Sequence, residues 1–178
     1  MLPCLILFAL GRADHGALKA SLLRAALGGL SRETLKAHTA RWIADFVPRG
    51  CFRDALAAIE AHRCQDDRLI LMSASVDVYV PELARALGFT ECICTPTAWR
   101  PDGLYDGRLA GPNCRDQEKV RRFRARSAQD PDCKTWAYGN SAPDLPHLQL
   151  ADRGIMVNAS KALRQRATAA GVECQHWR

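Results

Sequence analysis

No stretch of the sequence is apolar for long enough to cross a lipid bilayer as a helix, which takes about 20 residues. Residues 1–10 are apolar, but no basic segment precedes them and no small-residue cleavage site follows. A secretory signal peptide is therefore not indicated. We interpret residues 1–10 as part of a buried or membrane-facing helix. Apolar residues make up 48% of the 178-residue chain and charged residues 25%, which is typical of a soluble globular domain.

The cysteine spacings of disulfide-rich and zinc-binding modules are also missing. The eight cysteines include no Cys-x-x-Cys pair and no Cys/His spacing of a zinc site. We predict reduced thiols and a cytoplasmic protein, because disulfides are rare in the cytosol. The net charge is +6, and basic residues cluster in residues 119–126. We favour a solvated helix surface there over a nucleic-acid partner.

The first third of the chain has helical periodicity. Apolar residues recur every three or four positions in residues 16–27, 31–48 and 51–62. Pro48 is expected to end the second of these helices, because proline lacks the backbone donor that a helix interior needs. We interpret residues 1–65 as a helical cap subdomain.

From residue 66 onward, short apolar runs alternate with helical segments. This alternation predicts an α/β fold, with a Rossmann-like parallel sheet and helices on both faces, over residues 66–178. The predicted strands are residues 69–72, 92–94, 135–138 and 155–157, the hairpin is residues 97–111, and the helices are residues 77–87, 117–128, 144–150 and 160–170. In such folds the chemistry lies at the carboxyl ends of the strands.

Several polar residues lie near the predicted carboxyl ends of these strands or early in the helices that follow. Ser73 follows the first predicted strand and can donate a hydrogen bond to an anion, although it or Ser75 could instead cap the next helix. Lys119 lies early in a helix and can neutralise a phosphate as a point charge, whereas most helix lysines are solvated. Asn140 and Asp144 follow a later strand and carry oxygen atoms that suit Mg²⁺. The alternative there is a turn in which the aspartate caps the next helix.

The order of these features resembles motifs two, three and four of the haloacid-dehalogenase (HAD) phosphatases. Three stretches are similar to the phosphoserine-phosphatase-like branch, subfamily IB: LILMSASVDVYVPELARALGF from residue 69, DGRLAGPNCRDQEKV from residue 106 and WAYGNSAPDLPHLQLADRGIMVN from residue 136. The resemblance covers at least residues 68–168. It implies a Mg²⁺-dependent phosphomonoester hydrolase.

The resemblance also implies roles for individual residues. Ser73 and Lys119 would be the catalytic residues that hold the phosphoryl oxygens. Asn140 and Asp144 would be the Mg²⁺ ligands. The other implied substrate-binding residues are Ala74, Ser75, Asn113 and Ser141. The implied partner is a small phosphomonoester, such as phosphoserine or the phosphate of a phospholipid headgroup.

In two places the sequence departs from the family's pattern. No Asp-x-Asp-x-Thr motif, which supplies the nucleophile in the family, occurs among the 178 residues, so that the HAD core would lack its first strand. Asn140 stands where the family has an aspartate, and a neutral ligand should weaken Mg²⁺ binding. We therefore expect little or no turnover from the chain as written.

Three explanations or alternatives stay open at this point. We favour a truncated reading frame over a non-catalytic HAD-fold binding protein, because Ser73, Lys119 and Asp144 remain in place. A membrane-surface lipid phosphatase, similar to phosphatidylglycerophosphate phosphatases, is a further alternative. The apolar residues 1–10 and the positive net charge would suit an anionic bilayer.

Overall fold

Asp14 opens the described part of the chain, which in the computed structural model comprises residues 14–178. Its carboxylate accepts a hydrogen bond of 2.7 Å from the Ala17 N–H and so caps the first described helix, α2 (His15–Leu27). A cap of this kind satisfies a backbone donor that would otherwise have no partner in the first turn. The aspartate therefore fixes where α2 begins.

The described residues form two units, and each unit is made from two separate stretches of chain. We call the first the hairpin unit, residues 14–50 and 67–114. We call the second the three-strand unit, residues 51–66 and 115–178. The expected division into a helical cap and an α/β core after residue 65 stays a prediction.

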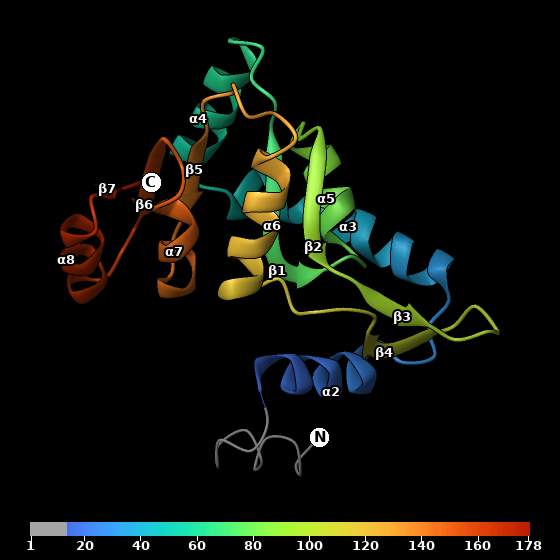
Figure 1. The fold of residues 1–178 in the computed structure, drawn as a ribbon. Helices are drawn as coiled ribbons and strands as arrows, with labels where there is room; N and C mark the ends of the chain where they lie inside the picture. The colour runs from blue at the N-terminus through green and yellow to red at the C-terminus, as the bar shows by residue number, and fades with distance from the viewer. Residues whose placement is uncertain (1–13) are drawn as a thin grey trace. The chain divides into compact units, whose positions relative to one another are not determined.

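The hairpin unit contains one parallel strand pair and one β-hairpin. In chain order its elements are α2, α3 (Arg32–Gly50), β1 (Ile70–Val76), α5 (Val80–Ala86), β2 (Glu91–Thr95), β3 (Thr97–Trp99) and β4 (Tyr105–Leu109). β1 and β2 pair in parallel with Leu71 opposite Cys92, and α5 packs against both strands. β3 and β4 are antiparallel, and α2 lies along β4 (Figure 1).

The close approach of α2 to β4 depends on Gly107. A Cβ atom at this position would lie 2.4 Å from the Arg24 Cα, far inside van der Waals contact. Gly107 also has a φ of +83°, which residues other than glycine adopt only with strain. The Arg24 guanidinium reaches Asp106 on β4, at 3.4 Å.

The three-strand unit holds a parallel sheet with the strand order β5–β6–β7. Its elements are α4 (Arg53–Arg63), α6 (Gln117–Ser127), β5 (Trp136–Gly139), a 3₁₀ turn (Ala142–Asp144), α7 (Leu145–Leu148), β6 (Arg153–Val157), α8 (Lys161–Ala169) and β7 (Glu173–Gln175). Its core joins α7, β6 and α8 through Leu148, Met156 and Ala167, all of them buried. α7 therefore packs directly behind the loop that follows β5.

The α/β class predicted from the sequence is confirmed, and the parallel strands belong to two sheets, one in each unit. β1 extends to Val76, so that Ser73 lies within the strand and not in a turn after it. α3 continues past Pro48 to Gly50, and the expected end at Pro48 is wrong. Proline withholds only its own N–H, which one last helical turn can tolerate. The sequence does not predict β7, a strand of three residues.

Within residues 14–178, no helix has both the length and the apolar character needed to cross a membrane. The helix expected in residues 1–10 lies outside the described residues. The seven cysteines from Cys51 onward are all free thiols, which agrees with the prediction of reduced thiols for this part of the chain.

Candidate functional site

Ser73 and Ser75 lie in the last part of β1, where the pairing with β2 becomes irregular. The Ser73 hydroxyl oxygen accepts a hydrogen bond of 3.1 Å from the Ser75 N–H. The next helix, α5, begins only at Val80, and its N-cap residue forms no side-chain cap bond. The alternative in which one of these serines caps that helix is therefore wrong.

The Ala74 carbonyl accepts hydrogen bonds from side chains of two other segments of the hairpin unit. The Lys19 ammonium on α2 and the Thr95 hydroxyl at the end of β2 both donate to it, the hydroxyl at 2.8 Å. Lys19 Nζ also donates to Asn113 Oδ1 at 2.5 Å, and the Cys114 N–H donates to Thr95 Oγ1 at 3.0 Å. The structure thus brings the predicted residues Ala74 and Asn113 together.

Asp77 fastens the end of β1 to the start of the hairpin. Its two carboxylate oxygens accept the Thr97 N–H at 3.1 Å and the Thr97 hydroxyl at 2.5 Å. α5 starts at Val80, later than residue 77, where the sequence predicts it, and the Asp77 N–H still donates to the Thr95 carbonyl of β2. The side chain that would sit in the first helical turn is engaged with β3 instead.

In the three-strand unit, Lys119 of α6 and Asp144 form a buried ion pair, with Lys119 Nζ 2.5 Å from Asp144 Oδ1. The other oxygen, Oδ2, accepts the Asn140 N–H at 3.2 Å, the Ser141 N–H at 3.1 Å and the Ser141 hydroxyl at 2.6 Å. Asp144 therefore closes the turn after β5, as the alternative interpretation holds, and also binds the lysine. Four predicted site residues meet here.

Gly139, the last residue of β5, leaves the room that Asp144 occupies. A Cβ atom on Gly139 would lie 2.6 Å from the Asp144 Cβ. Any larger residue would push the aspartate away from the end of the strand. The glycine before Asn140 is therefore required by packing in this loop.

Two ionisable groups, Asp144 in this loop and His147 in the adjoining helix α7, have shifted pKa values. Burial raises the pKa of the Asp144 carboxyl, but hydrogen bonds from Lys119 and Ser141 outweigh it, so that the pKa lies below its ordinary value. Burial, with the Lys119 charge as a smaller cause, lowers the pKa of His147 to about 4. Its buried Nδ1 has no hydrogen-bond partner among the described residues. At neutral pH the loop therefore holds a carboxylate and α7 a neutral imidazole.

The loop after β5 offers a partial set of ligands for Mg²⁺. In residues 14–178, no three His, Cys, Asp or Glu side chains gather in a way that could hold a metal ion. Mg²⁺ usually takes one or two protein carboxylates and completes its shell with waters and substrate phosphate oxygens. The Asp144 carboxylate and the exposed Asn140 amide fit that pattern.

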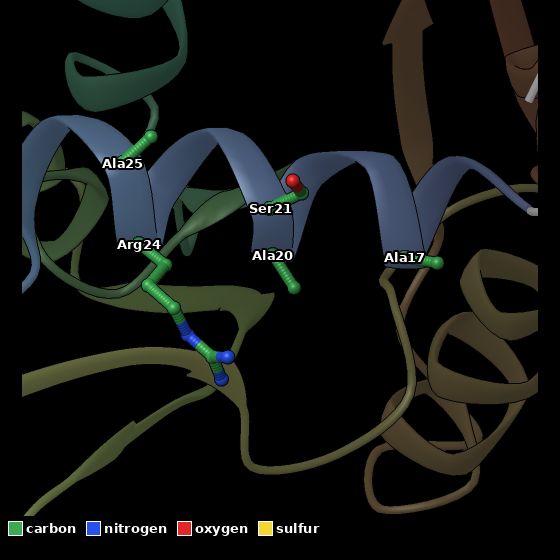
Figure 2. A pocket seen from close by; sticks show the side chains of 5 residues that line it. All are labelled: Ala17, Ala20, Ser21, Arg24 and Ala25. Carbon is green, nitrogen blue, oxygen red and sulfur yellow. The ribbon is translucent and has the colours of Figure 1, made fainter. Parts of the chain in front are cut away.

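A shallow hollow of about 450 Å³ runs along one side of α2. Figure 2 shows its lining: the small side chains of Ala17, Ala20, Ser21 and Ala25, with Arg24. At roughly 100° per residue, Lys19 points from the opposite side of the helix. The hollow is therefore separate from the cluster at Ala74.

Several residues in these two clusters are not identifiable from the sequence. Lys19 is an ordinary helix lysine there, 94 positions from Asn113. Thr95 ends a short strand and His147 lies in a short helix. These three residues are identified only by their burial and their contacts in the structure. The sequence pattern predicts neither the burial nor the contacts. The convergence of Ser73 and Lys119 on one phosphate stays a prediction.

Comparison with models of protein families identifies the family of this chain. The sequence model of the haloacid dehalogenase-like hydrolases matches residues 3–149, which is most of the chain. The chain belongs to this family. The matched range includes Ser73, Lys119 and the loop that holds Asp144.

Two relatives of this HAD protein support the assignment. Protein CicA of Caulobacter vibrioides is 33% identical over 151 residues, which cover 84% of this chain and 67% of the relative. A protein of Mycobacterium tuberculosis named as a probable phosphatase is 32% identical over 129 residues, 71% of this chain. The match spans 44% of that protein's length. Phosphatase-named proteins are thus among the relatives.

The fold of this HAD protein is similar to that of a probable phosphoserine phosphatase from Vibrio cholerae. The TM-score is 0.75 with 14% identity, and the match covers 98% of this chain and 50% of that one. The predicted membership of the HAD family is therefore confirmed, and the likeness to this phosphoserine phosphatase is one of fold.

Proposed function

We propose that the chain carries the phosphate-binding groups of a Mg²⁺-dependent phosphomonoester hydrolase, and that Ser73 and Lys119 bind phosphoryl oxygens. The observation that carries the proposal is the buried Lys119–Asp144 pair at the carboxyl end of β5. The Lys119 ammonium has three donors, of which Asp144 Oδ1 takes one, so that the others can be offered to an anion.

The remaining groups have distinct tasks in this proposal. The Ser73 hydroxyl donates to a phosphoryl oxygen, and Lys119 neutralises part of the phosphate charge. Asn140 and Asp144 would hold Mg²⁺, which offsets charge on the phosphoryl group. Ala74, Ser75, Asn113 and Ser141 shape the surroundings of the phosphate. The nucleophile is the one part that the resemblance requires and that no Asp-x-Asp-x-Thr motif among the 178 residues supplies.

Phosphate binding by the 178-residue chain tests the proposal directly. We expect inorganic phosphate to bind in isothermal titration calorimetry, and Ser73→Ala or Lys119→Met to weaken it by about 10- to 100-fold. That range corresponds to the loss of one charge-assisted hydrogen bond, roughly 1.5–3 kcal/mol. Lys36→Met, which removes an exposed lysine of α3, is the matched control and should bind like the unaltered chain. Equal affinity in all four proteins would contradict the proposal.

Hydrolysis needs a second experiment. We expect no turnover of p-nitrophenyl phosphate by the 178 residues, and Mg²⁺-dependent turnover once a strand that ends in Asp-x-Asp-x-Thr is added before residue 1. Turnover by the extended chain should disappear in its Lys119→Met variant. Phosphate binding without turnover in the extended chain would favour a non-catalytic binding protein.

The proposed substrate is a small phosphomonoester in the cytoplasm. A phospholipid headgroup phosphate is the alternative, and sedimentation with anionic vesicles separates the two. The soluble substrate predicts that the chain stays in the supernatant at physiological salt, whereas a lipid phosphatase would pellet with the vesicles.

A further inference from the structure

The peptide group between Ala74 and Ser75 is hydrogen-bonded through both its carbonyl and its N–H. On the carbonyl side, Lys19 Nζ and the Thr95 hydroxyl donate to the Ala74 oxygen. On the other side, the Ser75 N–H donates to Ser73 Oγ at 3.1 Å. In a trans peptide the C=O and N–H point in opposite directions, so the direction of the carbonyl sets that of the N–H.

This geometry decides which way the Ser73 hydroxyl can act. Because Ser73 Oγ accepts the Ser75 N–H, the serine's own hydrogen is left to donate to another group. The accepted bond does not create this donor, but it restricts the direction in which Ser73 Oγ, and so its hydrogen, can point. Rotation of the peptide would remove the N–H from Ser73 and free the hydroxyl to turn.

Thr95 by itself cannot hold the peptide. Its hydroxyl has one hydrogen but lies near two acceptors, Ala74 O at 2.8 Å and Asn113 Oδ1 at 3.2 Å. The Lys19 ammonium has three donors and bonds to both of these acceptors. Lys19 thus supplies the donor that the threonine lacks, and it carries a charge that strengthens both bonds.

We propose that Lys19 is a positioning residue for phosphate binding, which orients the Ser73 hydroxyl through the Ala74–Ser75 peptide. The proposal rests on the proposed function only in taking Ser73 as a phosphate ligand. It gives α2 a role in the site: the helix holds the end of β1 and the segment after β4, through Asn113, in one arrangement.

Amide hydrogen exchange at Ser75 tests the structural half without any ligand. In Lys19→Met we expect the Ser75 N–H to exchange at least about tenfold faster in ¹⁵N NMR, because roughly 1.4 kcal/mol of protection is lost. Lys36→Met should leave this rate unchanged. Lys19→Gln keeps neutral donors and should show a smaller increase, and it carries the test if the methionine variant does not fold. An unchanged Ser75 rate in the folded variants would overturn the proposal.

A double-mutant cycle on inorganic phosphate affinity tests the functional half. Lys19→Met should weaken binding about tenfold in the natural background, equal to roughly 1.4 kcal/mol, and have almost no effect in the Ser73→Ala background. Additive losses would mean that Lys19 acts independently of Ser73, and an unchanged affinity in Lys19→Met would mean no role at all. Either result overturns the proposal. If the unaltered chain binds no phosphate, the proposed function fails, and the Ser75 exchange rate still decides whether Lys19 orients the peptide.

Discussion

Asp144 uses both carboxylate oxygens inside the protein, one for Lys119 and the other for the turn after β5. Its orientation is therefore fixed before any ligand arrives, which would lower the entropic cost of binding the proposed cation. Asn140, by contrast, contributes only an exposed neutral amide beside this carboxylate. In the proposed function, the electrostatic part of Mg²⁺ binding would therefore depend on a single aspartate in this loop.

Asn140→Asp should strengthen Mg²⁺ binding. A second carboxylate replaces a neutral oxygen, and we expect affinity to rise about tenfold, or roughly 1.4 kcal/mol, in calorimetric titrations with MgCl₂. Gln149→Glu adds the same charge to an exposed position and controls for long-range attraction. Equal Mg²⁺ affinities in the two variants would show that position 140 does not face the cation.

His147 should make the three-strand unit sensitive to acid. Its pKa lies near 4 in the folded chain, against 6.5 ordinarily, because the neutral ring is buried. The unfolded chain therefore binds a proton between these values and the folded chain does not. The stabilising effect is complete above pH 6.5 and falls as the pH drops toward 4.

Between pH 7 and pH 5 this one group should cost roughly 2 kcal/mol in the free energy of unfolding. Urea unfolding at the two pH values measures the loss, and His147→Gln, which cannot titrate, should show that much less of it. If both proteins lose stability equally, the histidine does not stay neutral in the folded state.

At the scale of elements, the hairpin unit depends on how closely α2 can approach β4. Gly107→Ala should destabilise it, because the new methyl group meets the Arg24 backbone, which cannot rotate away. Gly103→Ala is the matched control: its φ of +80° imposes similar strain, but nothing lies within 4 Å of the added atom. We expect Gly107→Ala to lose about 1–3 kcal/mol more than the control in urea unfolding. Equal losses would mean that α2 can move away without cost.

The strands and helices could largely be predicted from the sequence, and the contacts between them could not. Leu69–Met72 and Ile155–Val157 are apolar runs that indicate buried strands on their own. β7, with Glu173 and Gln175, has no such signal and exists because β6 offers it an edge. The extension of β1 through Ser73 likewise depends on its pairing with β2.

In the candidate site, too, some residues could be predicted from the sequence and others could not. Ser73, Lys119 and Asp144 could be selected from the order of the motifs along the sequence, although Ser73 lies within β1 and not after it. Lys19 could not be, since its partner Ala74 lies 55 positions away and is engaged through its backbone, which any residue type would provide. Sequence patterns reveal the side chains that a site requires, while backbone acceptors become visible only in three dimensions.

At the scale of the whole molecule, the chain visits each unit twice. The two parallel sheets, β1–β2 and β5–β6–β7, therefore belong to different units, although the sequence alternates strand and helix without a break. Local alternation predicts the α/β class because each strand and helix is a short-range pattern. It does not specify which strands share a sheet, since that depends on long-range pairing.

The helix α4 shows what this arrangement means during synthesis. His62 on α4 bonds to the Tyr138 hydroxyl at 2.9 Å and stacks edge-on against Trp136, yet both aromatic residues belong to β5. On the ribosome, α4 emerges well before β5 exists, while the hairpin unit can finish folding in the interval. The nascent chain therefore carries α4 before the aromatic partners of His62 have been made, and this helix can complete these contacts only after β5 has left the ribosome.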